Sequence, residues 1–162
     1  MTERDRQYSW DDPQPLADAI RMLSGLDLLS QIAAGTLPSP SIGATLGFRL
    51  AEVEEGQATF EGGWAEHLLN PAGALHGGWY GILLDSAMGC AVHSTLPVGV
   101  GYTTLEYKVN ITRGITAKAG RLRAEGWVVH RGRRTATAEG RIIDAQDKIY
   151  AHGSETCLIL ER

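Results

Sequence analysis

The sequence is poor in the features that mark several large protein classes. It has two cysteines among 162 residues, Cys90 and Cys157, far apart and in no CxxC pattern. Both lie in apolar runs, so we expect two buried, reduced thiols. No apolar stretch reaches the ~18 residues of a membrane span, and the polar start MTERDRQYSWDD lacks the apolar region of a secretory signal. These absences predict a soluble cytoplasmic protein without a membrane partner.

Positive charge is not in excess either. Lys and Arg number 15 against 19 Asp and Glu, which gives a formal net charge of -4. A general nucleic-acid binder shows basic excess, so we expect no nucleic-acid partner. The run HRGRR, residues 130–134, is nevertheless a local basic cluster that suits an anionic ligand.

Familiar catalytic motifs are missing as well. The chain has no G-x-S-x-G, so a serine-elbow hydrolase is not expected. Its histidines have no metal-ligand spacing such as H-E-x-x-H, and no Walker or Rossmann glycine pattern occurs. We therefore expect neither a metal nor a separate cofactor.

The remaining pattern predicts one α+β domain with a long antiparallel sheet and one well-buried helix. Apolar spacing predicts an N-terminal helix over residues 16–34, which Gly25 weakens and Gly35 ends. The stretch LPSPSIGATLG is expected to be a loop. An apolar helix over residues 79–96 divides two strands from four more, and the strand-like runs are 47–56, 57–64, 102–112, 120–130, 134–144 and 148–160.

One acid interrupts the apolar helix. Residues 82–92 are apolar on nearly every side, which predicts a buried helix. An ionised Asp85 is costly there unless it is paired, hydrogen-bonded or beside a water-accessible pocket. Asp85 could therefore cap or pair structurally, or it could act as a base whose pKa burial raises toward neutrality.

The start of this helix offers a second candidate feature. Gly77 and Gly78 allow close backbone approach by a ligand, and the first N–H groups of a helix lack internal partners at the positive end of its dipole. Such N–H groups can hold an oxyanion. The alternative is that two glycines only permit tight packing at the helix entry.

Spacing decides how the two features can combine. Asp85 lies eight residues beyond Gly77, so about 12 Å separates them along one helix axis. A base and an oxyanion donor must both lie about 3 Å from the reacting atoms. One straight helix cannot supply both, whereas two antiparallel copies can. If both residues are catalytic, a two-fold dimer with shared sites follows.

The stretch LNPAGALHGGWYGILLDSAMGCAV resembles the PaaI-like acyl-CoA thioesterases of phenylacetic acid degradation, which have the hotdog fold. The shared pattern is Asn70, then His76-Gly77-Gly78, then Asp85, followed by strands such as YTTLEYKVNITR over a match of roughly residues 42–160. The resemblance implies residues 1–41 as an N-terminal tail and helix extension and residues 42–162 as the thioesterase domain. It also implies a curved antiparallel sheet around the central helix and a homodimer or homotetramer.

The resemblance further implies hydrolysis of an acyl-CoA thioester, with coenzyme A as part of the substrate. Asp85 would be nucleophile or general base, the Gly77 N–H the oxyanion donor from the opposing subunit, and Asn70 the side chain that positions carbonyl or water. His76 would position the donor or simply anchor its loop. Some relatives carry a hydroxyl one turn after the acid. That position is Gly89 here, so Ser86 or Thr104 would have to hold a water.

Coenzyme A carries phosphates, which arginine binds through its planar fork. We expect a basic rim from Arg113 and from the turn arginines Arg131, Arg133 and Arg134, although each could be an ordinary solvated residue. The aromatic residues Trp79, Tyr80 and Trp127 could line an acyl pocket or pack in the core. Two other functions remain open: a hydratase or dehydratase using His76 with Asp85, and a non-catalytic acyl-CoA binding module.

Overall fold

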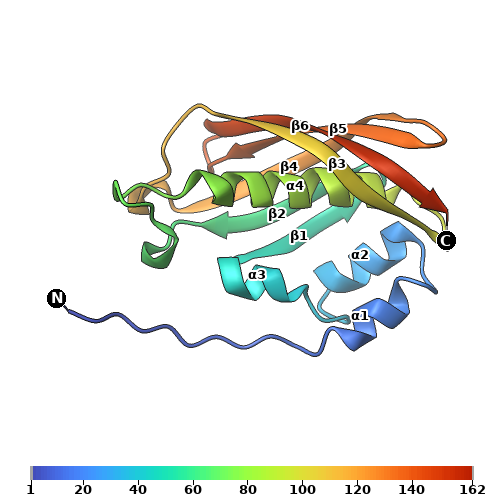
Figure 1. Ribbon diagram of the computed structural model, residues 1–162, viewed down its shortest axis with the longest axis horizontal. Helices are drawn as coiled ribbons and strands as arrows, with labels where there is room; N and C mark the ends of the chain where they lie inside the picture. The colour runs from blue at the N-terminus through green and yellow to red at the C-terminus, as the bar shows by residue number, and fades with distance from the viewer. Residues whose placement is uncertain (1, 162) are drawn as a thin grey trace.

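The computed structural model describes residues 2–161, and it forms a six-stranded antiparallel sheet with a long central helix (Figure 1). The sheet order is β1-β2-β4-β5-β6-β3. The helices are α1 (Gln14–Ala19), α2 (Gly25–Ala33), α3 (Ser41–Leu46) and α4 (Gly77–Ser94), with short 3-10 turns η1 (Glu66–Leu68) and η2 (Ala117–Ala119). The strands are β1 (Phe48–Glu54), β2 (Gln57–Gly63), β3 (Val100–Ile111), β4 (Arg121–Arg131), β5 (Thr135–Ile143) and β6 (Ile149–Glu161).

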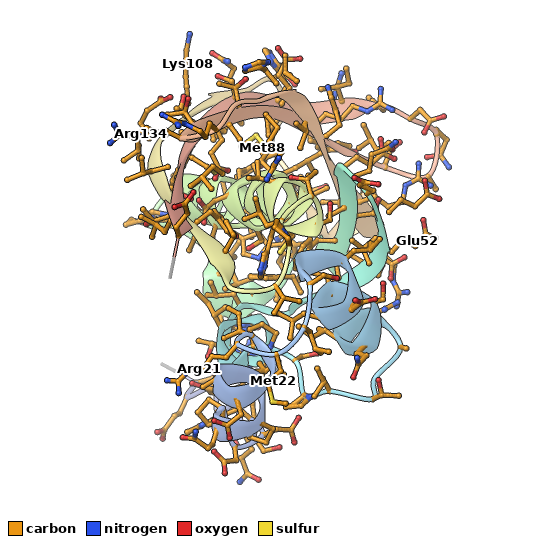
Figure 2. All side chains as sticks on the ribbon, turned by 90° about the vertical axis from the view of Figure 1, so that its right-hand side faces the viewer. Arg21, Met22, Glu52, Met88, Lys108 and Arg134 are labelled. Carbon is orange, nitrogen blue, oxygen red and sulfur yellow. The ribbon has the colours of Figure 1, made fainter. Side chains whose placement is uncertain are left out.

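The predicted α+β hotdog architecture is confirmed. Each of the six strand-like runs forms a strand within one or two residues of its expected bounds, and the apolar run forms α4. The sheet arches around α4, and the N-terminal helices lie on the side that the arch leaves open (Figure 2). Strand β3 is the last strand in the order, so one of its edges is unpaired within the chain.

Two glycines in neighbouring strands let the sheet lie directly on α4. Gly126 of β4 and Gly140 of β5 are paired in register. A Cβ atom at Gly126 would collide with the backbone of Ala87, and one at Gly140 would come within 2.9 Å of the Met88 side chain. Because both positions lack a side chain, the middle of α4 reaches the sheet and Met88 is fully buried there.

The expectation of one N-terminal helix over residues 16–34 is wrong, because α1 and α2 are separate. Helix α1 ends at Ala19, and Ser24 caps α2, since its Oγ accepts a hydrogen bond from the N–H of Asp27. Gly25 then packs against the His93 carbonyl at the end of α4, where any side chain would collide. Gly25 is therefore a contact point between α2 and α4. The apolar periodicity of residues 16–34 spans two helices, α1 and α2.

The expected loop before β1 is also wrong in part. Residues 41–46 form the short helix α3, which ends at Gly47 with a positive φ of 72°. Both cysteines are free thiols, and Cys157 is buried as predicted, whereas Cys90 is only half-buried. No helix among residues 2–161 is long and apolar enough to cross a membrane.

Candidate active site

The face of α4 that meets β3 carries a small residue or Asp85 at every fourth position. Gly77, Gly81, Asp85 and Gly89 follow one another along this face, as an α-helix requires of residues four apart. A Cβ atom at Gly81 or Gly89 would lie within 3.2 Å of a tyrosine hydroxyl. The β3 side chains opposite the four positions are, in the same order, Ile111, Tyr107, Thr104 and Tyr102. Asp85 is therefore the one side chain that α4 directs at β3 along this row.

Asp85 is half-buried and hydrogen-bonded to β3. The Thr104 hydroxyl lies 3.2 Å from Asp85 Oδ1. Burial raises the pKa of Asp85, and the hydrogen bond from Thr104 partly lowers it. A bulge helps to present this threonine, because the β3–β6 register shifts between Thr104 and Glu106.

The sequence interpretation missed a second acid at this point, Glu155 of β6. Its Oε1 lies 2.8 Å from the same Thr104 hydroxyl, and only 1% of the residue is exposed. Burial raises its pKa to about 7. The available signal was strand alternation: Glu155 and Cys157 occupy the inward-facing positions of β6, where an acid is out of place.

At the start of α4, His76 is the N-cap. Its Nδ1 accepts the Gly78 N–H at 3.0 Å, which places the ring proton on Nε2. Within residues 2–161 the exposed Gly77 N–H has no hydrogen-bond acceptor. The helix start therefore presents one free donor, and it lies beside Ile111 of β3.

Asn70 shapes the loop that leads to this helix. Its Oδ1 accepts hydrogen bonds from the N–H groups of Ala72 and Ala74, at 3.0 and 3.1 Å. Its backbone closes the same turn, with the Asn70 N–H donating to the Ala74 carbonyl at 2.8 Å. The side-chain oxygen is thus occupied, and the amide NH₂ is the group that Asn70 can offer to a ligand.

Asp85 lies in the wall of a small pocket between α3, β1, β2 and α4. The pocket has a volume of about 170 Å³. Its apolar lining comes chiefly from Ile42, Phe48, Leu50, Phe60 and Tyr102. A larger and more open hollow of about 530 Å³ adjoins it, but the acid in that hollow, Glu61, is held by Arg49 and Arg121 at 2.6 and 3.1 Å. Of these two hollows, the small pocket is therefore the one in which apolar walls surround an acid without an ion pair to any residue in 2–161.

The hydroxyl candidates are distinguished by their contacts. Ser86 also lines the pocket, yet its Oγ donates to the carbonyl of Ile82 one turn back, at 2.8 Å. Thr104 instead contacts Asp85 directly. Of the two candidate hydroxyl groups for holding a water, that of Thr104 is therefore the one next to the acid.

The four arginines do not gather at one place on the chain. Arg113 follows β3 near the start of α4, where its carbonyl accepts the Tyr80 hydroxyl at 3.3 Å. The other three lie at the β4–β5 turn, at the opposite end of the sheet (Figure 1), and they are Arg131, Arg133 and Arg134. All four are exposed.

The aromatic residues Trp79, Tyr80 and Trp127 do not line the pocket beside Asp85. Trp79 and Tyr80 are buried in the core, at 3% and 2% exposure. Trp127 follows Gly126, whose inner face touches α4, so the Trp127 side chain points to the outer face of the sheet. The aromatic walls beside Asp85 come instead from Phe48, Phe60 and Tyr102.

Among residues 2–161, no three His, Cys, Asp or Glu side chains are grouped closely enough to hold a metal ion. The polar groups at the site are carboxylates, a hydroxyl and backbone N–H groups. Asp85 could act as nucleophile or base, and the start of α4 could hold a developing negative charge.

Comparison with known proteins identifies the family of this chain. The thioesterase superfamily profile matches residues 72–151, which include the start of α4, Asp85 and Thr104. A solved protein of the thioesterase superfamily is 30% identical, with a TM-score of 0.66, over 83% of this chain and 97% of that one. The chain belongs to the thioesterase superfamily.

Two further solved structures relate it to phenylacetic acid degradation proteins. A phenylacetic acid degradation-related protein from Ralstonia eutropha is 28% identical, with a TM-score of 0.71, over 80% of this chain and 98% of that one. The PaaI protein of E. coli has the same fold at 23% identity, with a TM-score of 0.72, over 85% and 96% of the two chains. Comparison with curated proteins gives no match. The resemblance to PaaI-like proteins is confirmed.

Proposed function

We propose that this protein is an acyl-CoA thioesterase in which Asp85 is the nucleophile or general base. The observation that carries the proposal is the placement of Asp85, half-buried in the wall of an apolar pocket and hydrogen-bonded to Thr104. A buried carboxyl with a raised pKa is suited to general-base catalysis near neutral pH. Membership of the thioesterase superfamily supports the choice of a thioester as substrate.

The Gly77 N–H is the proposed oxyanion donor, and it acts on the substrate held at the partner's Asp85. The two residues are eight positions apart in α4, about 12 Å along the axis. The exposed apolar side chains of the edge strand β3 support a dimer through that strand, since Leu105, Tyr107 and Ile111 are 56%, 45% and 49% exposed. Because β3 also runs beside the α4 face that carries both residues, pairing two β3 edges brings two such faces together.

The reaction can follow either of two routes. Asp85 attacks the thioester carbon, coenzyme A leaves as the thiolate and takes up a proton, and water hydrolyses the resulting anhydride. Alternatively, Asp85 removes a proton from water, the water oxygen attacks the same carbon, and coenzyme A leaves as the thiolate and takes up that proton. In both routes the Gly77 N–H stabilises the negative carbonyl oxygen, and the Asn70 amide NH₂ positions the carbonyl or the water. Transfer of oxygen-18 from water into Asp85 during a single turnover distinguishes the first route.

The volume of the pocket supports a proposal for the size of the acyl group. A volume of about 170 Å³ is close to the roughly 150 Å³ of a cavity known to bind benzene. The proposed acyl group is therefore short or contains a single ring. The pantetheine and phosphates remain outside, where Gly78 allows close approach and where Arg113, Arg131, Arg133 and Arg134 are the proposed phosphate ligands from two subunits.

Thioester hydrolysis is favoured over a dehydratase reaction by the contacts of His76. A dehydratase would need His76 and Asp85 to act as a pair. His76 Nδ1 instead accepts the Gly78 N–H and caps α4, and Nε2 carries the ring proton, so neither nitrogen is free to act as a base. Its proposed role is to fix the start of the helix, which holds the Gly77 N–H in place.

The test is a hydrolysis assay over short, long and aromatic acyl-CoAs, comparing the wild type with Asp85→Asn. We expect turnover of short or single-ring thioesters and a loss of at least about 100-fold in kcat for Asp85→Asn, the usual scale for a positioned base. Asp18→Asn is the matched control, because Asp18 lies on the exposed helix α1 and should leave the rate unchanged. Absence of turnover on every acyl-CoA, or full activity of Asp85→Asn, would refute the proposal.

A further inference from the structure

Two buried or half-buried acids share one hydroxyl group in the interior of this protein. The Thr104 oxygen lies 2.8 Å from Glu155 Oε1 and 3.2 Å from Asp85 Oδ1. A hydroxyl has one hydrogen, so Thr104 can donate to only one of the two carboxyl groups at a time. The other carboxyl group must either donate to Thr104 or remain without that bond. The protonation of Glu155 therefore determines which contact Thr104 makes.

The surroundings of Glu155 favour its protonated form. The residue is 1% exposed, its Oε2 has no hydrogen-bond partner, and it forms no ion pair with any residue in 2–161. An ionised carboxylate in such a place pays a large desolvation cost. The second oxygen of a neutral carboxyl group is far less costly to leave unpaired. The pKa of Glu155, about 7, places its ionisation near neutrality.

The titratable groups that face Glu155 come from three elements. Each of them is neutral when protonated and negatively charged when deprotonated. Helix α4 contributes Asp85 and the Cys90 thiol, whose pKa burial raises to about 12. Strand β3 contributes Tyr102 and Glu106, and β6 itself contributes Cys157, whose thiol lies 3.0 Å from Glu155 Oε1. The buried residues of strand β5 are Ala136, Ala138, Gly140, Ile142 and Ile143, and none of them is titratable. Because Asp85 and Glu106 both disfavour ionisation of Glu155, a second negative charge beside Asp85 is unfavourable.

We propose that Glu155 is a positioning residue: in its protonated form it donates to Thr104 and thereby turns the Thr104 hydrogen toward Asp85. The resulting chain runs from Glu155 to Thr104 to Asp85, and it keeps Asp85 ionised and oriented toward the substrate. When Glu155 loses its proton, Thr104 turns to donate to Glu155, and Asp85 loses its donor beside a new negative charge. This inference rests on the proposed function of Asp85, and it makes catalysis depend on the protonation of a residue that never touches substrate.

The kinetic test uses Glu155→Gln, because the amide is neutral at every pH and retains an NH₂ donor. We expect wild-type kcat/KM to fall about tenfold as pH rises through the ionisation of Glu155, the effect of one charge-assisted hydrogen bond. We expect Glu155→Gln to match the wild type on the acidic side and to lack this fall. Glu139→Gln removes an exposed carboxylate from the adjacent strand β5 and should retain the wild-type profile. An alkaline fall that persists unchanged in Glu155→Gln overturns the proposal.

A second measurement does not require activity and so separates this inference from the proposed function. Carbon-13 NMR of the Glu155 carboxyl group in the intact protein should show titration near neutrality, and Asp85→Asn should lower that midpoint by removing the neighbouring negative charge. Titration of Glu155 in the ordinary carboxyl range, unaffected by residue 85, refutes the positioning role. If no acyl-CoA is hydrolysed but this coupled titration is observed, the proposed function fails while the shared hydroxyl stands.

Discussion

The ionisation of Asp85 depends on two opposing effects that come from different residues. Burial in α4 raises its pKa, and the Thr104 hydroxyl lowers it. A catalytic Asp85 must be ionised, so the contact with Thr104 extends activity toward lower pH. Helix α4 carries the carboxyl group, and the Thr104 hydroxyl of β3 favours its ionised form.

Thr104→Val tests this dependence because it removes the hydroxyl and keeps the shape. Without the donor only the raising effect of burial remains, so the pKa of Asp85 should increase. The acidic limb of the kcat/KM profile should move to higher pH by about one unit, with about tenfold less activity below that limb.

The control for this prediction is Thr103→Val, which removes the same group from the exposed neighbouring residue. Equal displacement of the acidic limb in both variants, or no displacement in Thr104→Val, would contradict the assigned contact. Measurement of kcat/KM from pH 4 to 8 on one acyl-CoA decides between these outcomes.

At this scale the sequence could predict Asp85 and could offer Thr104 as a candidate hydroxyl, but it could not predict that Thr104 contacts both Asp85 and Glu155. Asp85 is conspicuous because it is alone among apolar helix residues, which is a property of the local sequence. The contact between Thr104 and Glu155 is recognisable only after β3 and β6 have been paired and placed on α4, since the two residues are 51 positions apart along the chain. Their meeting is a consequence of sheet register, including the bulge after Thr104.

The central helix is positioned through residues that have no side chain. On the side facing β4 and β5 the sheet supplies the glycines, at Gly126 and Gly140. On the side facing β3 the helix supplies them, at Gly81 and Gly89, and the β3 tyrosines fill the space. The low amphipathicity of α4 follows from this arrangement, because strands approach it from several directions.

Gly126→Ala should therefore be among the more damaging conservative changes in the sheet. The new Cβ atom would meet the backbone of Ala87, which cannot move aside as a flexible side chain could. We expect a loss of about 1–3 kcal/mol in the free energy of unfolding, as for other overpacked cores. Urea denaturation of the wild type and the variant measures the difference.

Gly114→Ala is the paired comparison, because no atom lies within 4 Å of its added Cβ and its φ is not positive. We expect a change of zero to about 1 kcal/mol in the stabilising direction, from the reduced freedom of the unfolded chain. Similar stabilities for the two variants would show that Gly126 is not required for close packing of α4.

The N-terminal helices show where periodicity alone misleads. Apolar residues recur at helical spacing across residues 16–34, yet Ser24 caps a new helix and Gly25 docks on α4. The cap is a local signal that could have divided the segment, since serine is a preferred N-cap residue. The docking at His93 is a tertiary contact, and no local pattern contains it.

At the scale of the whole molecule, the spacing of two groups in one helix carries information about assembly. The Gly77 N–H and Asp85 are too far apart to act on one carbonyl group within a single chain. The four exposed arginines are likewise divided between the two ends of the sheet. Both separations are explained if each substrate is bound by two chains. Complementation can test this for Gly77 and Asp85.

Complementation requires two variants that each remove one half of the proposed site. Asp85→Asn removes the acid. Gly77→Pro removes the N–H alone, because proline is tolerated at the first position of a helix. The preceding His76 has φ and ψ of -63° and 133°, the extended conformation that a following proline favours. Each variant should be folded and inactive as a homodimer.

A hybrid dimer of the two variants contains both lesions in one shared site and neither lesion in the other. Hybrids isolated through two different affinity tags should therefore recover about half of the wild-type kcat, although both parents are inactive. Sites confined to single chains predict the opposite result, because every site in the hybrid would then retain one lesion and no activity would return. Circular dichroism of both parents establishes that inactivity is not unfolding. Recovery in the hybrid would show that Asp85 of one chain works with Gly77 of the other.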